Sequence, residues 1–275
     1  MDIQWFPGHM TKTKRQLLEQ LKWVDVIIET GDARLPLSSR NPLLRELLGA
    51  KPKLLVLNKA DLADEDQTGK WLKKLEQEGP VLAVSASTGA GMKKIIPMLE
   101  ELMAEKWQKL AEKGIKKPIR VMVVGIPNTG KSTIINTLTG RAQARTGNKP
   151  GVTRGSQWLR IHGRIELLDT PGMLWPKFDD QIIGRKLAAS GAVRDEVFDL
   201  EELAQWLIAW LQTNYQGALN KYYKTEQEEI NLETIGKERG CLISGGRVDT
   251  LKAAQIFFRE FRSAKIARAT LDRLE

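Results

Sequence analysis

The chain has 275 residues, of which 41% are hydrophobic and 28% are charged, and its formal net charge is +9. This length predicts one large domain and a smaller one, and the composition excludes a mostly disordered chain. There is no apolar run of the roughly 18 residues that a membrane span needs, no signal-peptide pattern, and a single cysteine, Cys241, which excludes an internal disulfide framework. We therefore expect a cytoplasmic protein without a membrane partner.

The positive charge is concentrated in the middle of the sequence. The net charge is +3 over residues 1–99, +9 over residues 100–165 and −3 over residues 166–275. A concentrated positive field is typical of a protein with a polyanionic partner such as nucleic acid. A basic, solvated face without such a partner explains the count equally well.

Short apolar runs alternate with helical patterns in the first two thirds of the chain. Continuous Val/Ile/Leu runs of this length predict strands buried on both faces, at residues 24–29, 53–57, 81–84, 120–124 and 165–168. Apolar residues at three- to four-residue spacing predict helices over 92–103 and 134–138. Pro97 argues against the start of the first helix, because proline fits a helix only in its first turn. This alternation predicts an α/β domain with a mostly parallel sheet.

After Pro176 the sequence has helical patterns only. One apolar face is formed by Leu200, Leu203, Trp206, Leu207, Trp210 and Leu211, and a second by Leu251, Ala254, Phe257, Phe258 and Phe261. The two tryptophans share a face with leucines, so we expect them in a core. We predict an α/β domain over residues 1–178 and a smaller all-helical domain over residues 179–275.

The first motif with chemical meaning is Asn58-Lys59-Ala60-Asp61, which follows the second predicted strand. This N-K-x-D pattern is typical of guanine-specific loops. The Asp61 carboxylate can accept hydrogen bonds from N1–H and the 2-amino group of guanine, and adenine offers neither donor, so discrimination is large. The stem of Lys59 would cover the base, and Asn58 would hold the loop together.

Ser85-Ala86-Ser87 follows the third predicted strand and fits the S-A-K/S loop. In such a loop a backbone N–H closes over O6 of guanine. Ser85, Ala86 and Ser87 are therefore further candidates for the guanine site.

The segment Gly125-Ile126-Pro127-Asn128-Thr129-Gly130-Lys131-Ser132 satisfies the phosphate-loop pattern G-x-x-x-x-G-K-S/T. It lies between a predicted strand and a predicted helix, as this motif requires. The loop N–H groups and the helix N-terminus would bind phosphate. The candidate residues are Asn128, Thr129, Gly130, Lys131, Ser132 and Thr133, with Lys131 at the β- and γ-phosphates and the Ser132 hydroxyl on Mg²⁺.

Two further segments complete a GTP site. Asp169-Thr170-Pro171-Gly172 is a D-x-x-G motif, in which Asp169 would hold Mg²⁺ through water and the Gly172 N–H would meet the γ-phosphate. Thr153 is the candidate switch threonine, ahead of Thr146 and Thr170, and would bind Mg²⁺ and the γ-phosphate.

The order of these motifs differs from that of ordinary GTPases, in which the phosphate loop comes first. Here N-K-x-D and S-A-S precede the phosphate loop, so the sequence predicts a circularly permuted Ras-like P-loop GTPase domain. The D-x-x-G motif then leads directly into the helical domain, so a change in that loop on hydrolysis could reorient the domain.

The permuted order, the Trp5–Met10 opening, the stretch 32–36 (DARLP) and the helical end together resemble the ribosome biogenesis GTPase A family over essentially the whole chain. The resemblance implies a cytoplasmic GTPase in late assembly of the bacterial large ribosomal subunit. It also implies a helical domain that contacts ribosomal RNA, and hydrolysis stimulated by the ribosomal particle. The expected partners are GTP, GDP and the subunit precursor with its RNA, and we expect a monomer.

The hydrolytic group is open at this point. Met173 occupies the position where many GTPases place a water-orienting Gln. The resemblance indicates His9 as the catalytic histidine, whereas the residues alone favour a structural histidine in a turn. Asn128 stands where K⁺-dependent GTPases coordinate K⁺, or it only shapes its loop. His162 is expected in an exposed hairpin turn.

Two alternatives to an assembly GTPase remain. A nucleotide-regulated RNA-binding or scaffold protein with negligible turnover is compatible with Met173. A permuted GTPase that acts on tRNA or in signalling is compatible with the nucleotide motifs. Lys252 and Arg259 lie opposite the apolar face of the last helix, with Arg262 at its edge, and form either an RNA-binding surface or a solvated helix back.

Overall fold

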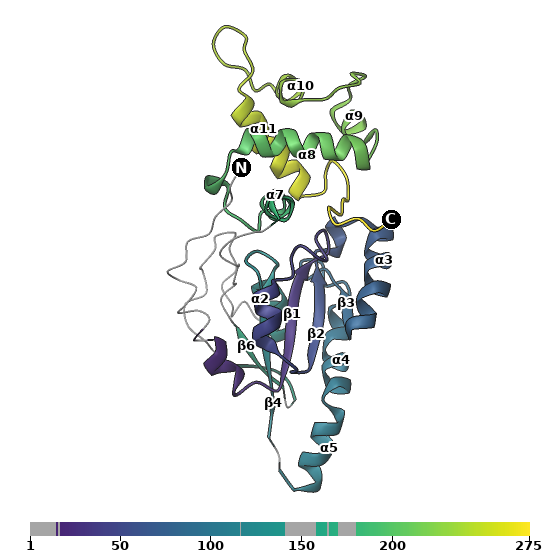
Figure 1. The fold of residues 1–275 in the computed structure, drawn as a ribbon, viewed down its shortest axis with the longest axis vertical. Coiled ribbons are helices and arrows are strands. Elements are labelled where there is room, and N and C mark those ends of the chain that lie inside the picture. Colours follow the sequence, from purple (N-terminus) through teal and green to yellow (C-terminus); the bar gives the residue numbers. More distant parts are fainter. Residues whose placement is uncertain (1–14, 16, 116, 141–157, 164, 170–179) are drawn as a thin grey trace.

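The structure is a computed structural model, and it describes residue 15 and residues 17–115, 117–140, 158–163, 165–169 and 180–275 (Figure 1). Six strands form one sheet in the order β3-β2-β1-β4-β6-β5. The strands are β1 (Val26–Asp32), β2 (Lys53–Asn58), β3 (Val81–Ala83), β4 (Ile119–Gly125), β5 (Trp158–His162) and β6 (Ile165–Asp169). Only the edge strand β5 pairs antiparallel, with β6.

The helices that flank this sheet are α2 (Pro42–Leu48), α3 (Glu65–Leu75), α4 (Ile95–Leu102), α5 (Ala104–Glu112) and α6 (Lys131–Thr139). Those of the helical domain are α7 (Gln181–Ser190), α8 (Leu200–Asn214), α9 (Ala218–Tyr223), α10 (Leu232–Glu238) and α11 (Thr250–Arg262). Short 3₁₀ turns are η1 (Ala60–Leu62), η2 (Glu76–Glu78), η3 (Met92–Lys94) and η4 (Asp195–Val197). None of these helices, within the described residues, is long and apolar enough to cross a membrane.

The sheet is buried on both faces, as the continuous apolar runs predict. Along β1, Val26 and Ile28 pack on the side of α4 and α6, whereas Ile27 packs on the side of α2. Farther along the sheet, β2 and β3 pack on Trp71 and Leu75 of α3. The result is a three-layer α/β/α domain in the described residues up to 169, which we call the sheet domain.

All five predicted strands are confirmed, with ends that shift by no more than three residues. The helix predicted over 92–103 begins as η3 and continues as α4, in which Pro97 is the third residue and so lies in the first turn. The strand β5 has no long apolar run because its residues alternate between exposed and half-buried.

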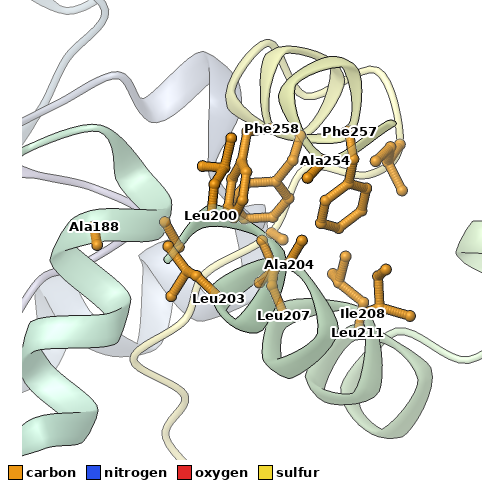
Figure 2. Close-up of a cluster of buried hydrophobic side chains, with 14 of the residues drawn as sticks. Ala188, Leu200, Leu203, Ala204, Leu207, Ile208, Leu211, Ala254, Phe257 and Phe258 are labelled. Carbon is orange, nitrogen blue, oxygen red and sulfur yellow. The ribbon is translucent and has the colours of Figure 1, made fainter. Parts of the chain in front are cut away.

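The helical domain, residues 180–262, packs α7, α8 and α11 around one core (Figure 2). The apolar faces of α8 and α11 meet there, and Leu207, Leu211 and Phe257 are fully buried. Trp206 and Trp210 pack at the edge of this core, as expected. The prediction for Leu251 is wrong: it lies in the first turn of α11 with 49% of its surface exposed, and Ala253 faces the core instead.

The segment after α11, residues 263–275, is not helical and returns to the sheet domain (Figure 1). We call it the returning tail. The Asp272 carboxylate accepts hydrogen bonds from the backbone N–H of Leu37 and Ser38 at 2.9 and 2.7 Å, and Lys186 Nζ lies 2.8 Å from it. The domain boundary predicted near residue 178 falls outside the described residues and stays a prediction.

The core of the helical domain gives a first prediction. Phe257→Ala removes a fully buried ring, so we expect the helical domain to lose about 3–5 kcal/mol of unfolding free energy. Urea denaturation followed by tryptophan fluorescence measures it. Leu251→Ala on the same helix is the matched control and should cost less than about 1 kcal/mol, because that side chain is half-exposed. Equal losses in the two variants would contradict the packing described.

Candidate nucleotide-binding site

The candidate residues meet at the carboxyl ends of the central strands. Strand β1 lies between β2 and β4, and the chain runs from β1 toward one edge of the sheet and from β4 toward the other. Parallel α/β sheets bind ligands at such a switch point, outside the carboxyl ends of the strands. The ends of β1 and β2 are level, since Asp32 pairs with Asn58.

The phosphate loop follows β4 and is held from β1. The Thr129 hydroxyl donates to the Ile126 carbonyl at 3.0 Å and shares a 2.9 Å hydrogen bond with the Thr30 hydroxyl. Thr30 lies opposite Gly125 in the parallel register, and its hydroxyl also contacts the Val124 carbonyl at 3.0 Å. These buried contacts fix the curvature of the loop before any ligand binds.

Two glycines allow the loop to approach its neighbours. Gly125 has φ +154°, and a Cβ there would lie 2.3 Å from Thr30 Oγ1. Gly130 has φ +87°, and a Cβ there would lie 2.2 Å from Asn58 Nδ2. Both positions require glycine for space as well as for backbone conformation.

Helix α6 begins at Lys131 behind Gly130, and no side chain of the described residues caps its first turn. The N-terminal end of a helix attracts an anion. Lys131 is buried and its Nζ donates to the Ile126 carbonyl at 2.9 Å, inside the loop. Ser132 and Thr133 are half-buried in the same turn.

The side-chain amide of Asn58 joins three motifs. Its Nδ2 donates to the Thr129 carbonyl of the phosphate loop at 2.9 Å, and its Oδ1 accepts from the Ala86 N–H at 2.9 Å. Thr137 of α6 also donates to the Ala86 carbonyl, at 3.1 Å. Ser85 is buried, and its hydroxyl lies 3.1 Å from that of the exposed Ser87. The guanine candidates and the phosphate candidates therefore form one continuous site.

Asp61 lies in η1 with a free acceptor. Its Oδ1 is buried and has no hydrogen-bond partner in the part of the chain that the structure describes. A buried acceptor left unpaired is costly, so an external donor at this point would be favourable. The N1–H and 2-amino group of guanine are such donors.

Lys59 is strained and anchored. Its backbone lies in the left-handed region with φ +63°, which is uncommon for a lysine. Its Nζ donates to Asp32 Oδ2 at 2.9 Å. Burial would raise the pKa of the Asp32 carboxyl, but the charges of Arg34 and Lys59 outweigh burial and hold that pKa far below its usual range.

Asn128 connects the phosphate loop with the helical domain. Its backbone is left-handed with φ +60°, and its Nδ2 donates to the Gly191 carbonyl, just after α7, at 2.7 Å. An amide nitrogen used in this way leaves the Oδ1 atom as the one that could ligate a cation.

Other predicted residues are not placed. His9, Thr153 and Gly172 lie outside the described residues, as does Met173. Asp169 is the last residue of β6, level with Val123 of β4, and its side chain is not described. His162 is exposed at the β5–β6 turn as predicted, and its Nδ1 lies 3.8 Å from Glu100 Oε1.

Two of the candidate residues offer oxygen ligands for a metal. Among the described residues, no group of three or more His, Cys, Asp or Glu could hold a metal ion. A hydroxyl at Ser132 and a carboxylate at Asp169 are hard oxygen donors, which suit Mg²⁺ when phosphate oxygens supply the remaining ligands.

Sequence reasoning did not assign a role to Thr30, Asp32 or Arg34. In the sequence, Asp32 and Arg34 belong to the stretch 32–36, which carries only a family resemblance, and Thr30 belongs to no motif. The signal was available, because Thr30 and Asp32 are polar residues at the end of a buried parallel strand beside two nucleotide motifs. Thr129, a partner of Thr30, lies 99 residues away in sequence, and Lys59, one partner of Asp32, lies 27 residues away, which no local pattern reveals.

Comparisons with known proteins agree with this geometry. Residues 120–236 match the family described as 50S ribosome-binding GTPase. The chain is similar to ribosome biogenesis GTPase A of Bacillus licheniformis, with 44% identity over 100% of this chain and 99% of that protein. It is 36% identical to mitochondrial ribosome-associated GTPase 1 of Mus musculus, over 98% of this chain and 90% of that protein. The fold matches GNP-bound YlqF from T. maritima with a TM-score of 0.67 and 28% identity, covering 95% of this chain and 98% of that one.

The two glycines that bound α6 give a matched test of the site. We expect Gly130→Ala to weaken GDP binding at least about tenfold, because the new Cβ would displace Asn58 and with it the link between motifs. Gly140→Ala at the other end of α6 also has positive φ but meets nothing within 4 Å. It should cost about 1–2 kcal/mol of stability and leave affinity unchanged. Titration of a fluorescent GDP analogue distinguishes the two, and equal affinities would refute the collision.

Proposed function

The chain belongs to the ribosome biogenesis GTPase A family and is therefore a GTPase that serves as an assembly factor for the large ribosomal subunit, and we propose that it cycles on and off the precursor particle with its nucleotide state. In this proposal the GTP form binds the maturing particle in the cytoplasm, late in assembly, and hydrolysis releases it. The protein acts as a monomer.

The observation that supports a guanine-nucleotide site best is the Asn58 bridge. One buried amide of the N-K-x-D loop forms hydrogen bonds with both the S-A-S loop and the phosphate loop. The Asp61 Oδ1 atom, which has no hydrogen-bond partner among the described residues, would then face the base edge, and Lys131 and the start of α6 would face the phosphates. An adenine base would leave Asp61 without donors, so GTP is preferred.

Mg²⁺ is the metal that suits this donor set. Ser132 and Thr153 would ligate it directly and Asp169 through water, and Gly172 would meet the γ-phosphate. When bound, the ion neutralises charge on the phosphates. The Asn128 Oδ1 atom is the candidate ligand for K⁺, which would add a second positive charge beside them.

The attacking water needs an orienting group from elsewhere, because Met173 cannot make a strong hydrogen bond. We assign this role to His9, whose neutral imidazole can orient water near pH 7. An alternative function, a nucleotide-regulated scaffold with negligible turnover, rests on the same methionine.

The RNA partner is supported by the charge distribution. Residues 100–165 hold the largest positive excess, whereas residues 166–275 are net negative. On α11, Lys252 and Arg259 are exposed, but Arg262 is engaged with the Ala188 and Ala189 carbonyls. The helical domain can therefore offer ribosomal RNA only a local basic face, and the affinity should fall steeply with salt.

Co-sedimentation tests the proposed cycle. We expect the protein loaded with a non-hydrolysable GTP analogue to sediment with large-subunit precursor particles, and the GDP-loaded protein to stay in the supernatant. Mature subunits are the control for assembly specificity. Equal sedimentation in both nucleotide states would refute a nucleotide-controlled cycle.

Turnover tests His9. We expect the precursor particle to stimulate GTP hydrolysis, and His9→Ala to lose most of this stimulation while its GTP affinity stays within about twofold of the unmodified protein. His162→Ala, at the remote exposed turn, is the matched control and should retain full stimulation. Negligible hydrolysis by the unmodified protein with the particle would favour the scaffold alternative.

Salt identity tests the cation. With the particle present and ionic strength held constant, we expect faster GTP hydrolysis in KCl than in NaCl, because Na⁺ is too small for a site that fits K⁺ at Asn128. The single-turnover rate measures the chemical step directly. Equal rates in the two salts would remove K⁺ from the proposal.

A further inference from the structure

We propose that Asp32 and Arg34 are positioning residues of the guanine pocket. They make the orientation of Lys59 depend on the position of the helical domain relative to the sheet domain. The proposal rests on the assignment of Asn58–Asp61 as the guanine loop. It adds residues outside the nucleotide motifs and assigns them a specific task.

Asp32 is the point of contact between two cations. Its Oδ2 accepts from Lys59 Nζ at 2.9 Å and from Arg34 Nη2 at 2.7 Å, and its Oδ1 accepts from Arg34 Nε at 2.9 Å. The arginine fork is therefore bidentate, which fixes the carboxylate in angle as well as in distance. The Asp32 side chain is only 4% exposed, so solvent cannot replace either cation.

Lys59 needs this anchor because its backbone is strained. A lysine at φ +63° does not hold that conformation by itself, and the surrounding contacts must impose it. The salt bridge to Asp32 fixes the far end of the side chain, while the register of β1 against β2 fixes the near end. The stem between them is the part that would lie along the base.

Arg34 is shared with the helical domain. Its Nη2 also donates to the Ser190 carbonyl, the last residue of α7, at 3.2 Å, and its Nη1 to the Arg262 carbonyl, the last residue of α11, at 3.5 Å. Two helices thus direct their negative carboxyl ends toward one guanidinium. The Arg34 carbonyl in turn accepts from the Leu271 N–H of the returning tail at 2.8 Å.

The returning tail also grips the guanine loop from its other side. Arg268 Nε donates to the Ala63 carbonyl at 2.9 Å and its Nη2 to the Ala60 carbonyl at 3.1 Å, at either end of η1. Asp64, next in the chain, accepts from the Tyr215 hydroxyl at 2.9 Å. The loop that contains Asp61 is therefore held between the sheet and the helical domain.

Coupling of this kind is reciprocal. If contact between the helical domain and Arg34 favours the orientation of Lys59 that binds guanine, then a bound guanine nucleotide shifts the equilibrium toward that domain contact by the same factor. A partner that moves the domain would weaken the hold on the base without touching the nucleotide.

The test uses the full chain and two variants, Asp32→Asn and Arg34→Lys. The first removes the charge that holds Lys59, and the second keeps the charge of Arg34 but loses the fork. We expect each to weaken GDP binding at least about tenfold and to lower the preference for GDP over IDP, which lacks the 2-amino group. A merely structural role would lower thermal stability and leave that preference unchanged in the folded protein.

Glu260→Gln is the matched control. Glu260 is a second buried carboxylate in a salt bridge, at 2.8 Å from Arg239 Nε and from the Tyr223 hydroxyl, but inside the helical domain. This variant should lose stability and keep both the GDP affinity and the GDP-over-IDP preference.

Hydrogen exchange tests the reverse direction. In the unmodified protein, we expect GDP to increase protection of a peptide covering residues 264–272, and in Arg34→Lys we expect this increase to disappear. An unchanged GDP-over-IDP preference in both folded variants, or undiminished GDP-dependent protection in Arg34→Lys, would overturn the proposal. If the unmodified protein does not prefer GDP to IDP, the guanine assignment itself fails, and the proposal fails with it.

Discussion

Three segments that are far apart in the chain meet at the side-chain amide of Asn58. The amide is buried and uses its donor on the phosphate loop and its acceptor on the S-A-S loop. Leaving either group unpaired in the interior costs about 1–3 kcal/mol, so the three loops are stable together rather than one at a time. Two other features follow from this. Position 130 must be glycine because the phosphate loop approaches Asn58 closely, and the Thr30–Thr129 hydrogen bond holds the loop at that place.

The contact between the two domains also contains many hydrogen bonds between segments that are far apart in the chain. Leu35 and Ile126 of the sheet domain pack into the core of the helical domain. Most of the hydrogen bonds described across the contact end on backbone carbonyls, such as those of Ser190, Gly191, Ala60 and Ala63. Hydrogen bonds of this kind can be broken and remade in water more readily than apolar packing, because their groups find other partners when they separate. Tyr215 is part of the contact, and burial raises the pKa of its hydroxyl to about 12, so it stays a donor to Asp64 at physiological pH.

Much of the sheet and of the site could be predicted because both depend on local patterns. Strands buried on two faces have continuous apolar runs, and phosphate and guanine loops have fixed spacing directly after them. Strand β5 could not be predicted from an apolar run, because it lies at the edge of the sheet and its residues are exposed or half-buried. The prediction for Leu251 is wrong because the first turn of α11 projects beyond the core. The partners of Arg34 and Asn128 in the helical domain could not be predicted for another reason: they are backbone carbonyls, which any residue type supplies, at separations of 63–228 residues.

The permuted strand order has a consequence for biosynthesis. Strands β1, β2 and β3 emerge first and occupy one continuous half of the sheet, so this half can pair before any part of the phosphate loop exists. Strand β4 then adds beside β1 and brings the phosphate loop to Asn58. Arg268 forms a hydrogen bond with the guanine loop and Leu271 with Arg34, and both residues are translated after these partners. A nascent chain therefore can form its sheet early, but it completes the contacts of the guanine pocket only after residue 271 has been translated, which separates folding of the domain from the onset of tight nucleotide binding.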